Sequence, residues 1–422
     1  MTDQSNNQNS SPEAIKDSRF ALKNKQLAIA AIFLAAFSIV GAFMANRYLF
    51  LDKKELASIE NKIQQQLLPP TASNTAILAK ETEGISPETE EISLIAVGDI
   101  SFSRSVERMT KIHGTDYPLS KIKEYLQGAD IVFGNLETPI TTGREISSGE
   151  MIFRSNPGAE TALKDARFNL LSLANNHTMN FGIKGLRDTF KYLEQAGIEY
   201  VGAGENDQKA YQPVYTEMKG MNPVRSNPAK RDADALTHQT SNGVKFAFLA
   251  YQNPKIVPTS YGATASRAGT AFMDAEKMAK AIKEAKQNTD FVIVSMHAGD
   301  EYASKPNSYQ INFAHAAIDA GADLVIGHHP HVVQTMEEYK GKYIFYSLGN
   351  FVFDQIWSQD TKRGLTVKIF FTKDKITGIS FLPVVIENYC QPRPADEKES
   401  RQILQRLNLP LPEELKRPWS NK

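Results

Sequence analysis

The sequence predicts one α/β domain preceded by a single transmembrane helix. Two observations predict the domain: short apolar runs recur along the chain, and amphipathic helical patterns separate most of them. This alternation is typical of largely parallel strands that helices cover on their faces. The transmembrane helix is predicted by an apolar stretch near the amino terminus that contains no charged residue.

Composition limits the classes of function. Lys plus Arg and Asp plus Glu number 48 each, so no overall field favours nucleic acid or another polyanion. The hydrophobic share of 41% is enough for one substantial core. The single cysteine, Cys390, excludes an internal disulfide and a thiolate metal cluster. A metal site in this chain would therefore use nitrogen and oxygen ligands.

The apolar stretch runs from Leu27 to Ala45. At about 1.5 Å per residue it nearly crosses a hydrocarbon core of roughly 30 Å. We therefore predict a transmembrane anchor at 27–50. A cleaved signal peptide is the alternative, but the stretch is long for one and lacks a clear cleavage site. Basic residues flank it on both sides, so the positive-inside rule gives no orientation.

Residues 51–91 are predicted to be a stalk and a flexible linker. Leu56, Ile59, Ile63 and Leu67 follow a helical spacing, which favours a juxtamembrane amphipathic helix over pairing with a second copy. The Ser, Thr, Pro and Glu content of the following residues, up to Glu91, is typical of a tether.

The predicted domain covers 92–390. Its expected strands are the runs ISLIAVG, DIVFGN, NLLSLANN, VKFAFLAY, DFVIVSMH, ADLVIGHH and YIFYSLGN, and helical patterns cover 185–197 and 275–287. Residues 221–243, rich in Pro, Asn, Arg and Asp, are predicted to be an inserted surface loop. The remaining 391–422 is expected to be a tail with one possible helix at 397–408.

Polar side chains stand at the ends of six of these runs. They are Asp99; Asn135 and Glu137; Asn176 and His177; His297; His328, His329 and His331; and Asn350. Each alone could be a turn former or a solvated loop residue. Because the carboxyl ends of parallel strands meet at one edge of a sheet, we expect all of them to converge on one crevice.

The residue types favour a divalent metal site. Carboxylates, amides and imidazoles are ligands for Mn, Fe or Zn. A bridging carboxylate would hold two cations roughly 3.5 to 4 Å apart, where they activate water and bind a phosphoryl oxygen. Pro330, with its fixed φ, is expected to present His329 and His331 from a loop of low entropy.

Seven motifs carry a resemblance to a known family. AVGDISFSR, GNLETPIT, FRSNP, LANNHTMNFG, MHAGDEY, GADLVIGHHPHVVQ and YSLGNFVFD resemble, in order, the CapA family of poly-γ-glutamate capsule synthesis proteins, which is similar to the calcineurin-like metallophosphoesterases. The resemblance covers Ile92 to Ile386. It implies a four-layer α/β/β/α sandwich of metallophosphoesterase type outside the cytoplasm on a single-pass cell-membrane anchor, which makes 1–26 the cytoplasmic tail.

The resemblance also implies roles for individual residues. Asp99 would bind a first metal ion, Glu137 would bridge two ions, and Asn176 and His297 would bind the second. The G-H-x-H spacing fits the GHHPH loop in two ways; we choose His329 and His331 as ligands, with His328 as the alternate. His177 resembles the histidine that protonates a leaving oxygen or stabilises the transition state. Asn135 and Arg104 are further catalytic candidates. Arg104 and Arg154 could each hold an anion or form a surface ion pair.

The chain departs from these patterns at three positions. Ser101 stands where the phosphoesterase D-x-H motif has histidine, so the first metal is expected to be weakly bound or absent. Asn180 stands where CapA-like chains have aspartate, which is expected to leave His177 less basic and less well oriented. Ala298 replaces a tryptophan.

Three functions are compatible with the sequence. The first is a membrane-anchored, metal-dependent hydrolase for synthesis or export of poly-γ-glutamate or a similar polymer. Its partners would be an anionic polymer or phosphate-containing substrate and membrane subunits of a capsule synthase, and we expect no nucleic acid. The second is a non-catalytic, metal-bearing scaffold that binds the polymer. The third, a purely structural anchor, is disfavoured because Glu137, Asn176, His177 and His297 are retained.

Overall fold

The computed structural model describes residues 91–144, 151–219, 243–408 and 415–419. They belong to one compact unit, Glu88–Lys422. The predicted anchor (27–50), the stalk and linker up to residue 90, and residues 221–242 of the predicted insertion lie outside the described residues. None of the helices within the described ranges is long and apolar enough to cross a membrane.

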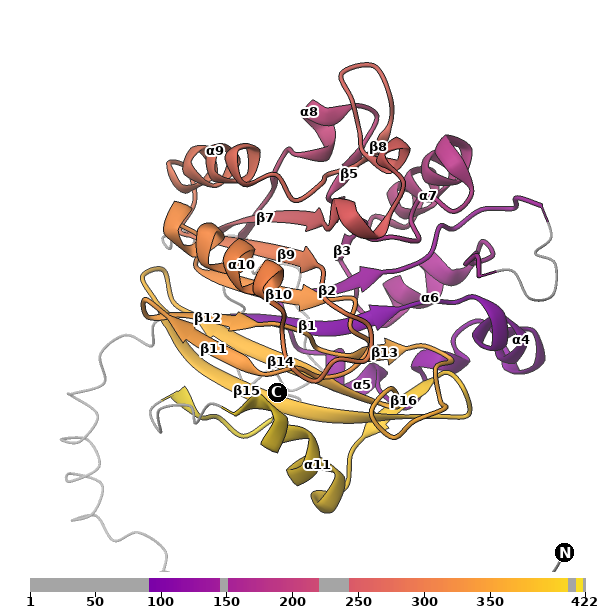
Figure 1. The fold of residues 1–422 in the computed structure, drawn as a ribbon. Helices are drawn as coiled ribbons and strands as arrows, with labels where there is room; N and C mark the ends of the chain where they lie inside the picture. Colours follow the sequence, from indigo (N-terminus) through magenta and orange to yellow (C-terminus); the bar gives the residue numbers. More distant parts are fainter. Residues whose placement is uncertain (1–90, 145–150, 220–242, 409–414, 420–422) are drawn as a thin grey trace, which may run out of the picture. The chain divides into compact units, whose positions relative to one another are not determined.

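Two sheets form the centre of the domain (Figure 1). The eight-stranded sheet runs in the order β16-β15-β14-β1-β2-β3-β4, with β13 also paired to β1. Its strands are β1 (Ile92–Ile100), β2 (Ile131–Leu136), β3 (Leu170–Ser172), β4 (Glu199–Val201), β13 (Asn350–Val352), β14 (Arg363–Phe371), β15 (Ile376–Glu387) and β16 (Gln391–Pro394). Strands β1 to β4 are parallel, and β14 to β16 add antiparallel strands beside β1.

The six-stranded sheet runs in the order β11-β12-β10-β9-β7-β6. Its strands are β6 (Val214–Met218), β7 (Val244–Gln252), β9 (Phe291–His297), β10 (Leu324–His328), β11 (Met336–Tyr339) and β12 (Lys342–Phe345). The four inner strands are parallel, and both edge strands are antiparallel. A separate pair joins β5 (Ala203–Gly204) to β8 (Gly269–Thr270).

Aromatic side chains join the two sheets across the core. The ring of Phe371 on β14 contacts Phe246 of β7 and Phe291 of β9 edge-on, with centroids 5.1 and 4.8 Å apart. Phe133 of β2 stacks on Phe248 of β7 at 5.9 Å. All five rings are buried. Such pairs add about 0.5–1.5 kcal/mol each to the burial of their apolar area, so they hold the sheets face to face.

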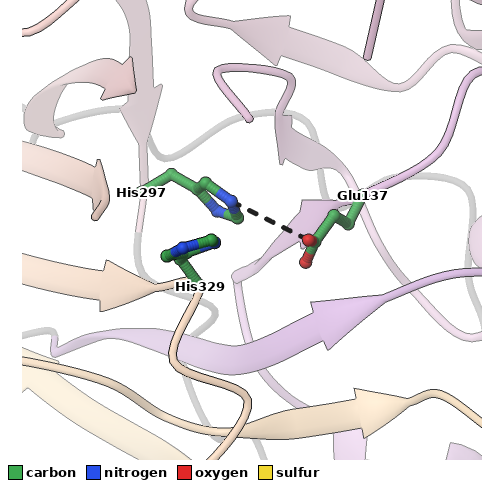
Figure 2. A group of neighbouring side chains, drawn as sticks. All are labelled: Glu137, His297 and His329. Carbon is green, nitrogen blue, oxygen red and sulfur yellow. Dashed lines mark ion pairs between the residues drawn. The ribbon is translucent and has the colours of Figure 1, made fainter. Parts of the chain in front are cut away.

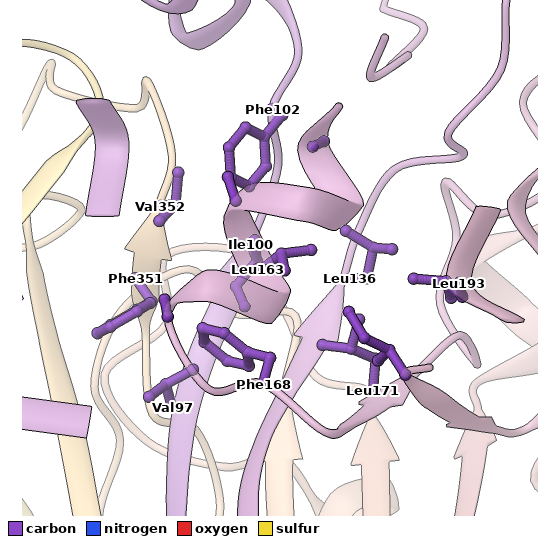
Figure 3. Close-up of a cluster of buried hydrophobic side chains, with 14 of the residues drawn as sticks. Val97, Ile100, Phe102, Leu136, Leu163, Phe168, Leu171, Leu193, Phe351 and Val352 are labelled. Carbon is purple, nitrogen blue, oxygen red and sulfur yellow. The ribbon is translucent and has the colours of Figure 1, made fainter. Parts of the chain in front are cut away.

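Helices cover the outer faces of both sheets. Leu163 of α6 and Leu193 of α7 pack with Leu171 and Phe168 against the eight-stranded sheet (Figure 3), and α9 and α10 cover the six-stranded sheet (Figure 1). The α-helices among the described residues are α4 (Arg104–His113), α5 (Lys123–Leu126), α6 (Ala159–Asp165), α7 (Gly182–Ala196), α8 (Asp207–Ala210), α9 (Ala275–Lys286), α10 (Ser308–Ala320) and α11 (Glu397–Leu404), and α11 contributes to the core between the sheets. The layers therefore run helix, sheet, sheet, helix, and the predicted α/β class is confirmed.

Local sequence explains where the long helices begin and end. The Asp274 side chain accepts hydrogen bonds from two backbone N–H groups at the start of α9. Asn307 and Gln310 form a reciprocal capping box at the start of α10. Helix α7 ends at Gly197, whose φ of +64° is left-handed and suits glycine. The helical patterns at 185–197 and 275–287 correspond to α7 and α9.

The carboxyl-terminal part of the domain differs from the expectation. The sequence pattern did not predict the long hairpin of β14 and β15, which packs beside β1. The folded unit also continues past the expected domain end at residue 390, because β16 pairs with β15. Helix α11 occupies the position of the expected tail helix, and its buried Ile403 joins the core between the sheets.

We predict that Phe371→Ala lowers the free energy of unfolding by about 3–5 kcal/mol, because it removes a ring that contacts both sheets. The adjacent Phe370 is a matched control, since it is partly exposed on the other face of β14. Phe370→Ala should cost less than half as much. Urea unfolding of both variants measures the difference, and equal losses would contradict this account of the core.

Candidate metal centre

The strand-end residues converge at the junction of the two sheets. Register aligns Asp99 of β1 with Asn135 of β2, and Asn135 with Ser172 of β3. In the other sheet, His297 of β9 aligns with His328 of β10. Carboxyl and amide groups therefore come from the first sheet, and most of the imidazoles come from the second.

Backbone geometry positions both Asp99 and the histidine loop. A Cβ atom at Gly98 would lie 2.0 Å from the carbonyl oxygen of Gly349, so glycine allows β1 to approach that loop. The next residue, Asp99, donates its backbone N–H to the same oxygen at 2.9 Å. His329 and His331 flank Pro330 with φ of +98° and +57°. Such conformations are strained for histidine and concentrate at functional sites.

Glu137, His297 and His329 form the first possible metal-binding group, and their nearest ligand atoms all lie within 4.8 Å of one another (Figure 2). His297 Nε2 lies 3.8 Å from Glu137 Oε1 and 2.9 Å from Asn176 Oδ1. His329 Nδ1 is buried and has no hydrogen-bond partner among the described residues. The predicted ligands of the second metal thus lie together.

Asp99, Glu137 and His331 form the second group, within the same 4.8 Å limit. His331 Nε2 lies 3.8 Å from Glu137 Oε1, and His331 Nδ1 lies 3.5 Å from Asp99 Oδ2. Asn350 donates its Nδ2–H to the backbone of Thr361, so its Oδ1 accepts the Nδ1–H of His331 at 2.9 Å. This contact leaves His331 Nε2 available to a ligand.

The donor set fits divalent cations. Ligand atoms bonded at 2.0–2.2 Å lie roughly 2.8 to 3.6 Å apart around one ion. The Nε2 atoms of His297 and His331 each lie 3.8 Å from Glu137 Oε1, slightly further apart than that. Glu137 belongs to both groups, and its Oε1 is buried without a hydrogen-bond partner in the described residues. A cation on each side of Glu137 would satisfy this orphaned oxygen.

The electrostatics of the two acids also suit a cation. Burial and the neighbouring Asp99 carboxylate raise the pKa of Glu137 well above its usual value. For Asp99, burial opposes ionisation, but the imidazoles of His328, His331 and His297 outweigh it and hold its pKa below the ordinary value. Bringing a positive ion between the two carboxylates would favour the ionised form of both.

Two ligand candidates are neutral imidazoles. Burial lowers the pKa of His297 well below its usual value. Burial, reinforced by His331, lowers the pKa of His329 to about 3. Metal ions bind the neutral imidazole, so no proton has to be displaced from an imidazolium at neutral pH.

His177 lies at the exposed side of the cluster. Its Nε2 is 4.0 Å from Glu137 Oε1, and its side chain keeps 14% exposure, whereas Glu137 has none. Burial lowers the pKa of His177 to about 4. Its Nδ1–H donates to Asn180 Oδ1 at 2.8 Å, and that oxygen also accepts the Phe153 N–H at 2.9 Å. Asn180 therefore orients His177, contrary to our expectation, although an amide adds no charge to raise its basicity.

Of the two arginine candidates, only Arg104 lies near the centre. Its guanidinium pairs with Asp354 and lies 4.4 Å from the centroid of Phe153, and that ring stacks on His177 at 3.7 Å. Arg154 instead donates to the carbonyls of Gly143 and Arg144, which indicates a structural role.

The remaining candidates support the centre from within. Asn135 Nδ2 donates to Asp99 Oδ1 at 2.8 Å and lies 3.3 Å from His297 Nδ1. His328 Nδ1 lies 3.4 Å from Asp99 Oδ1, and His328 belongs to neither metal-binding group. The geometry therefore favours His329 and His331 over His328 as ligands. Ala298 is buried, and its N–H bonds the His328 carbonyl at 3.1 Å, linking the ends of β9 and β10.

Sequence reasoning missed two supporting residues. Asn175 donates to Asn135 Oδ1 at 3.0 Å, and its own Oδ1 accepts the backbone N–H of His177. Phe153 covers one face of the His177 ring. Both lie in motifs that carry the family resemblance, LANNHTMNFG and FRSNP, and this position is the sequence signal that could have identified them.

Several known proteins are similar to this chain. Residues 93–355 match the family model described as bacterial capsule synthesis protein PGA_cap. The chain is 34% identical to the capsule biosynthesis protein CapA of Bacillus anthracis, over 74% of this chain and 72% of that protein. It is 31% identical to the PGA biosynthesis protein CapA of Bacillus subtilis, over 76% and 79%. A solved calcineurin-like phosphoesterase, YfkN from Bacillus subtilis, matches 75% of this chain and 96% of its own, with 13% identity and a TM-score of 0.41.

We predict that Mn²⁺ or Zn²⁺ raises the melting temperature of the purified full-length protein, because an ion that binds only the folded state stabilises it. Glu137→Gln should abolish most of this shift, since it removes the charge shared by both groups. His315→Ala is the matched control, because His315 pairs with Glu337 and belongs to neither metal-binding group. An unchanged shift in Glu137→Gln would refute the shared-ligand interpretation.

Proposed function

Because this chain belongs to the PGA_cap family of bacterial capsule synthesis proteins, we propose that it is a metal-dependent phosphoesterase-like hydrolase in the synthesis or export of poly-γ-glutamate or a similar anionic capsule polymer. The observation that carries the hydrolase proposal is Glu137, which belongs to two metal-sized groups and presents an unpartnered oxygen between them. One structural ion would need only one metal-binding group, whereas two groups that share a carboxylate suit a two-metal hydrolase.

Two divalent ions, of Mn, Fe or Zn, would activate a water molecule and polarise a phosphoryl oxygen. Glu137 would bridge them, Asp99 and His331 would hold one, and Asn176, His297 and His329 would hold the other. In this proposal the chain's own residues orient the substrate and move its protons.

His177 is the proposed proton-transfer residue. Its Nδ1–H is engaged by Asn180, so Nε2 carries no proton in the neutral ring and is the atom that would accept a proton from the attacking water and pass it to the leaving oxygen. The ring of Phe153 on one side and the hydrogen bond on the other restrict its rotation. Arg104, with 24% of its side chain exposed, is the cation that would face an anionic group entering from solvent.

A scaffold role is the second candidate. Ser101 stands where a further imidazole would complete the Asp99 group, and its hydroxyl instead contacts Ser103 at 2.8 Å. A protein with one weakened metal position could bind the polymer without hydrolysing a bond. In either role we propose a single-pass membrane anchor at 27–50, a domain outside the cytoplasm, and capsule synthase membrane subunits as partners.

We predict that His177→Ala lowers turnover of an aryl phosphate with Mn²⁺ by about 10² to 10⁴, because it removes a group that acts in the transition state. Metal content should stay at the wild-type value. His113→Ala serves as the control, since His113 is exposed on α4 and stacks on Tyr117. Capsule complementation in cells then separates the roles: rescue by His177→Ala but not by Glu137→Ala would favour the scaffold.

A second prediction concerns Asn180→Asp. A carboxylate at this position can accept the same two hydrogen bonds and also stabilises the imidazolium, so the pKa of His177 should rise from about 4. The pH–rate limb assigned to His177 should shift to higher pH by about one unit or more. NMR titration of the metal-free protein measures the pKa directly. A limb that does not move, while the pKa does, would remove His177 from proton transfer.

A further inference from the structure

Two exposed aromatic side chains lie together at the rim of the metal centre. Tyr302 follows β9 and is 45% exposed, and Trp357 follows β13 and is 62% exposed. Their rings pack edge to face, with centroids 5.9 Å apart and an interplanar angle of 76°. Exposed apolar residues are ordinary when isolated, but a contacting pair beside a polar centre indicates a binding surface.

A backbone hydrogen bond fixes Tyr302 relative to the metal centre. Tyr302 donates its N–H to the Pro330 carbonyl at 2.8 Å, within the loop that carries the candidate histidine ligands. Its φ of +66° is left-handed, a conformation that costs energy for a bulky side chain. The Tyr302 ring lies nearly parallel to His331, at 6.2 Å and 28°. Tyr302 is therefore fixed to the metal-binding loop, and Trp357 contacts its ring edge-on.

Charge limits what this surface could bind. Burial, and then the Glu301 carboxylate, raises the pKa of Tyr302 to about 12, so the phenol is neutral. Glu301 is itself exposed beside the pair. The positive charge of Arg104 also acts on Tyr302, and Arg104 would face the phosphoryl group. Glu301 would disfavour a second anionic group on the ring pair itself, whereas an uncharged ring would stack on the indole and phenol faces.

We propose that Tyr302 and Trp357 form a subsite for an uncharged ring, sugar or aromatic, in the organic group attached to a metal-bound phosphoryl group. This inference rests on the proposed phosphoesterase function and narrows its substrate class to ring-bearing phosphate esters. The phosphoryl group would bind at the buried metal centre, and the ring would lie on the exposed faces of Tyr302 and Trp357.

Binding of small phosphates to the full-length protein with Mn²⁺ tests this assignment. Methyl phosphate and phenyl phosphate carry the same charge but differ in the ring, and glucose 6-phosphate tests a sugar ring. By calorimetry, phenyl phosphate should bind about 2- to 10-fold more tightly than methyl phosphate. In a Trp419→Phe background, where Trp357 is the sole tryptophan, phenyl phosphate should quench the fluorescence more than methyl phosphate.

Trp357→Ala and Tyr302→Ala should abolish the preference for the ring and leave methyl phosphate affinity within about twofold. Tyr389→Ala is the matched control, because Tyr389 is 41% exposed and contacts Arg108 instead. If these variants bind both phosphates less tightly by the same factor, or lose bound Mn²⁺, the subsite proposal is wrong. The two rings would then serve to cover His331. Failure of the wild type to bind either phosphate would instead refute the phosphoesterase function.

Discussion

Two carboxyl groups, Asp99 and Glu137, are buried completely at the junction of the two sheets. An ion removed from water costs several kcal/mol unless it is paired and hydrogen-bonded. Asp99 receives such partners from Asn135, the His329 N–H and nearby imidazoles. Glu137 is only partly satisfied: its Oε2 accepts one long hydrogen bond from Asn135 Nδ2, at 3.4 Å, and its Oε1 has no hydrogen-bond partner among the described residues. A positive ion bound to Glu137 would supply the partner that its Oε1 lacks.

This requirement links the chemistry to the packing. One sheet supplies Asp99 and Glu137, and the other supplies His297, His329 and His331. Neither sheet alone holds a metal-binding group, so the distances across the centre depend on how the sheets are held together. Phe371 and its partners fix that spacing from within the core. A core substitution that changes the distance between the sheets would therefore also change the distances between the candidate ligands.

The convergence of strand ends could be predicted from sequence because strand direction and buried apolar runs are local properties. The predicted positions Asp99, Glu137, His297 and His331 do lie together. Supporting contacts could not be predicted, since they cross between distant segments. Asn350 holds His331 through a strand that pairs with β1, and the Phe153 ring reaches His177 from a separate loop. The β14–β15 hairpin was not predicted because it joins the sheet by pairing with β1, a strand more than 260 residues earlier in the chain.

The two metal-binding groups differ in chemistry, and this bears on the choice between enzyme and scaffold. The group of His297 and His329 adds two imidazoles and the Asn176 amide to Glu137, a set that suits Zn or Fe. The group of Asp99, Glu137 and His331 has two carboxylates and one imidazole. This set suits Mn, and we expect it to bind an ion more weakly than the imidazole-rich group does. Under the proposed function the imidazole-rich position would bind an ion first, and the second position would bind one only at higher metal concentration. Hydrolysis that needs both ions would follow occupancy of the weaker position, whereas a scaffold would need only the stronger one.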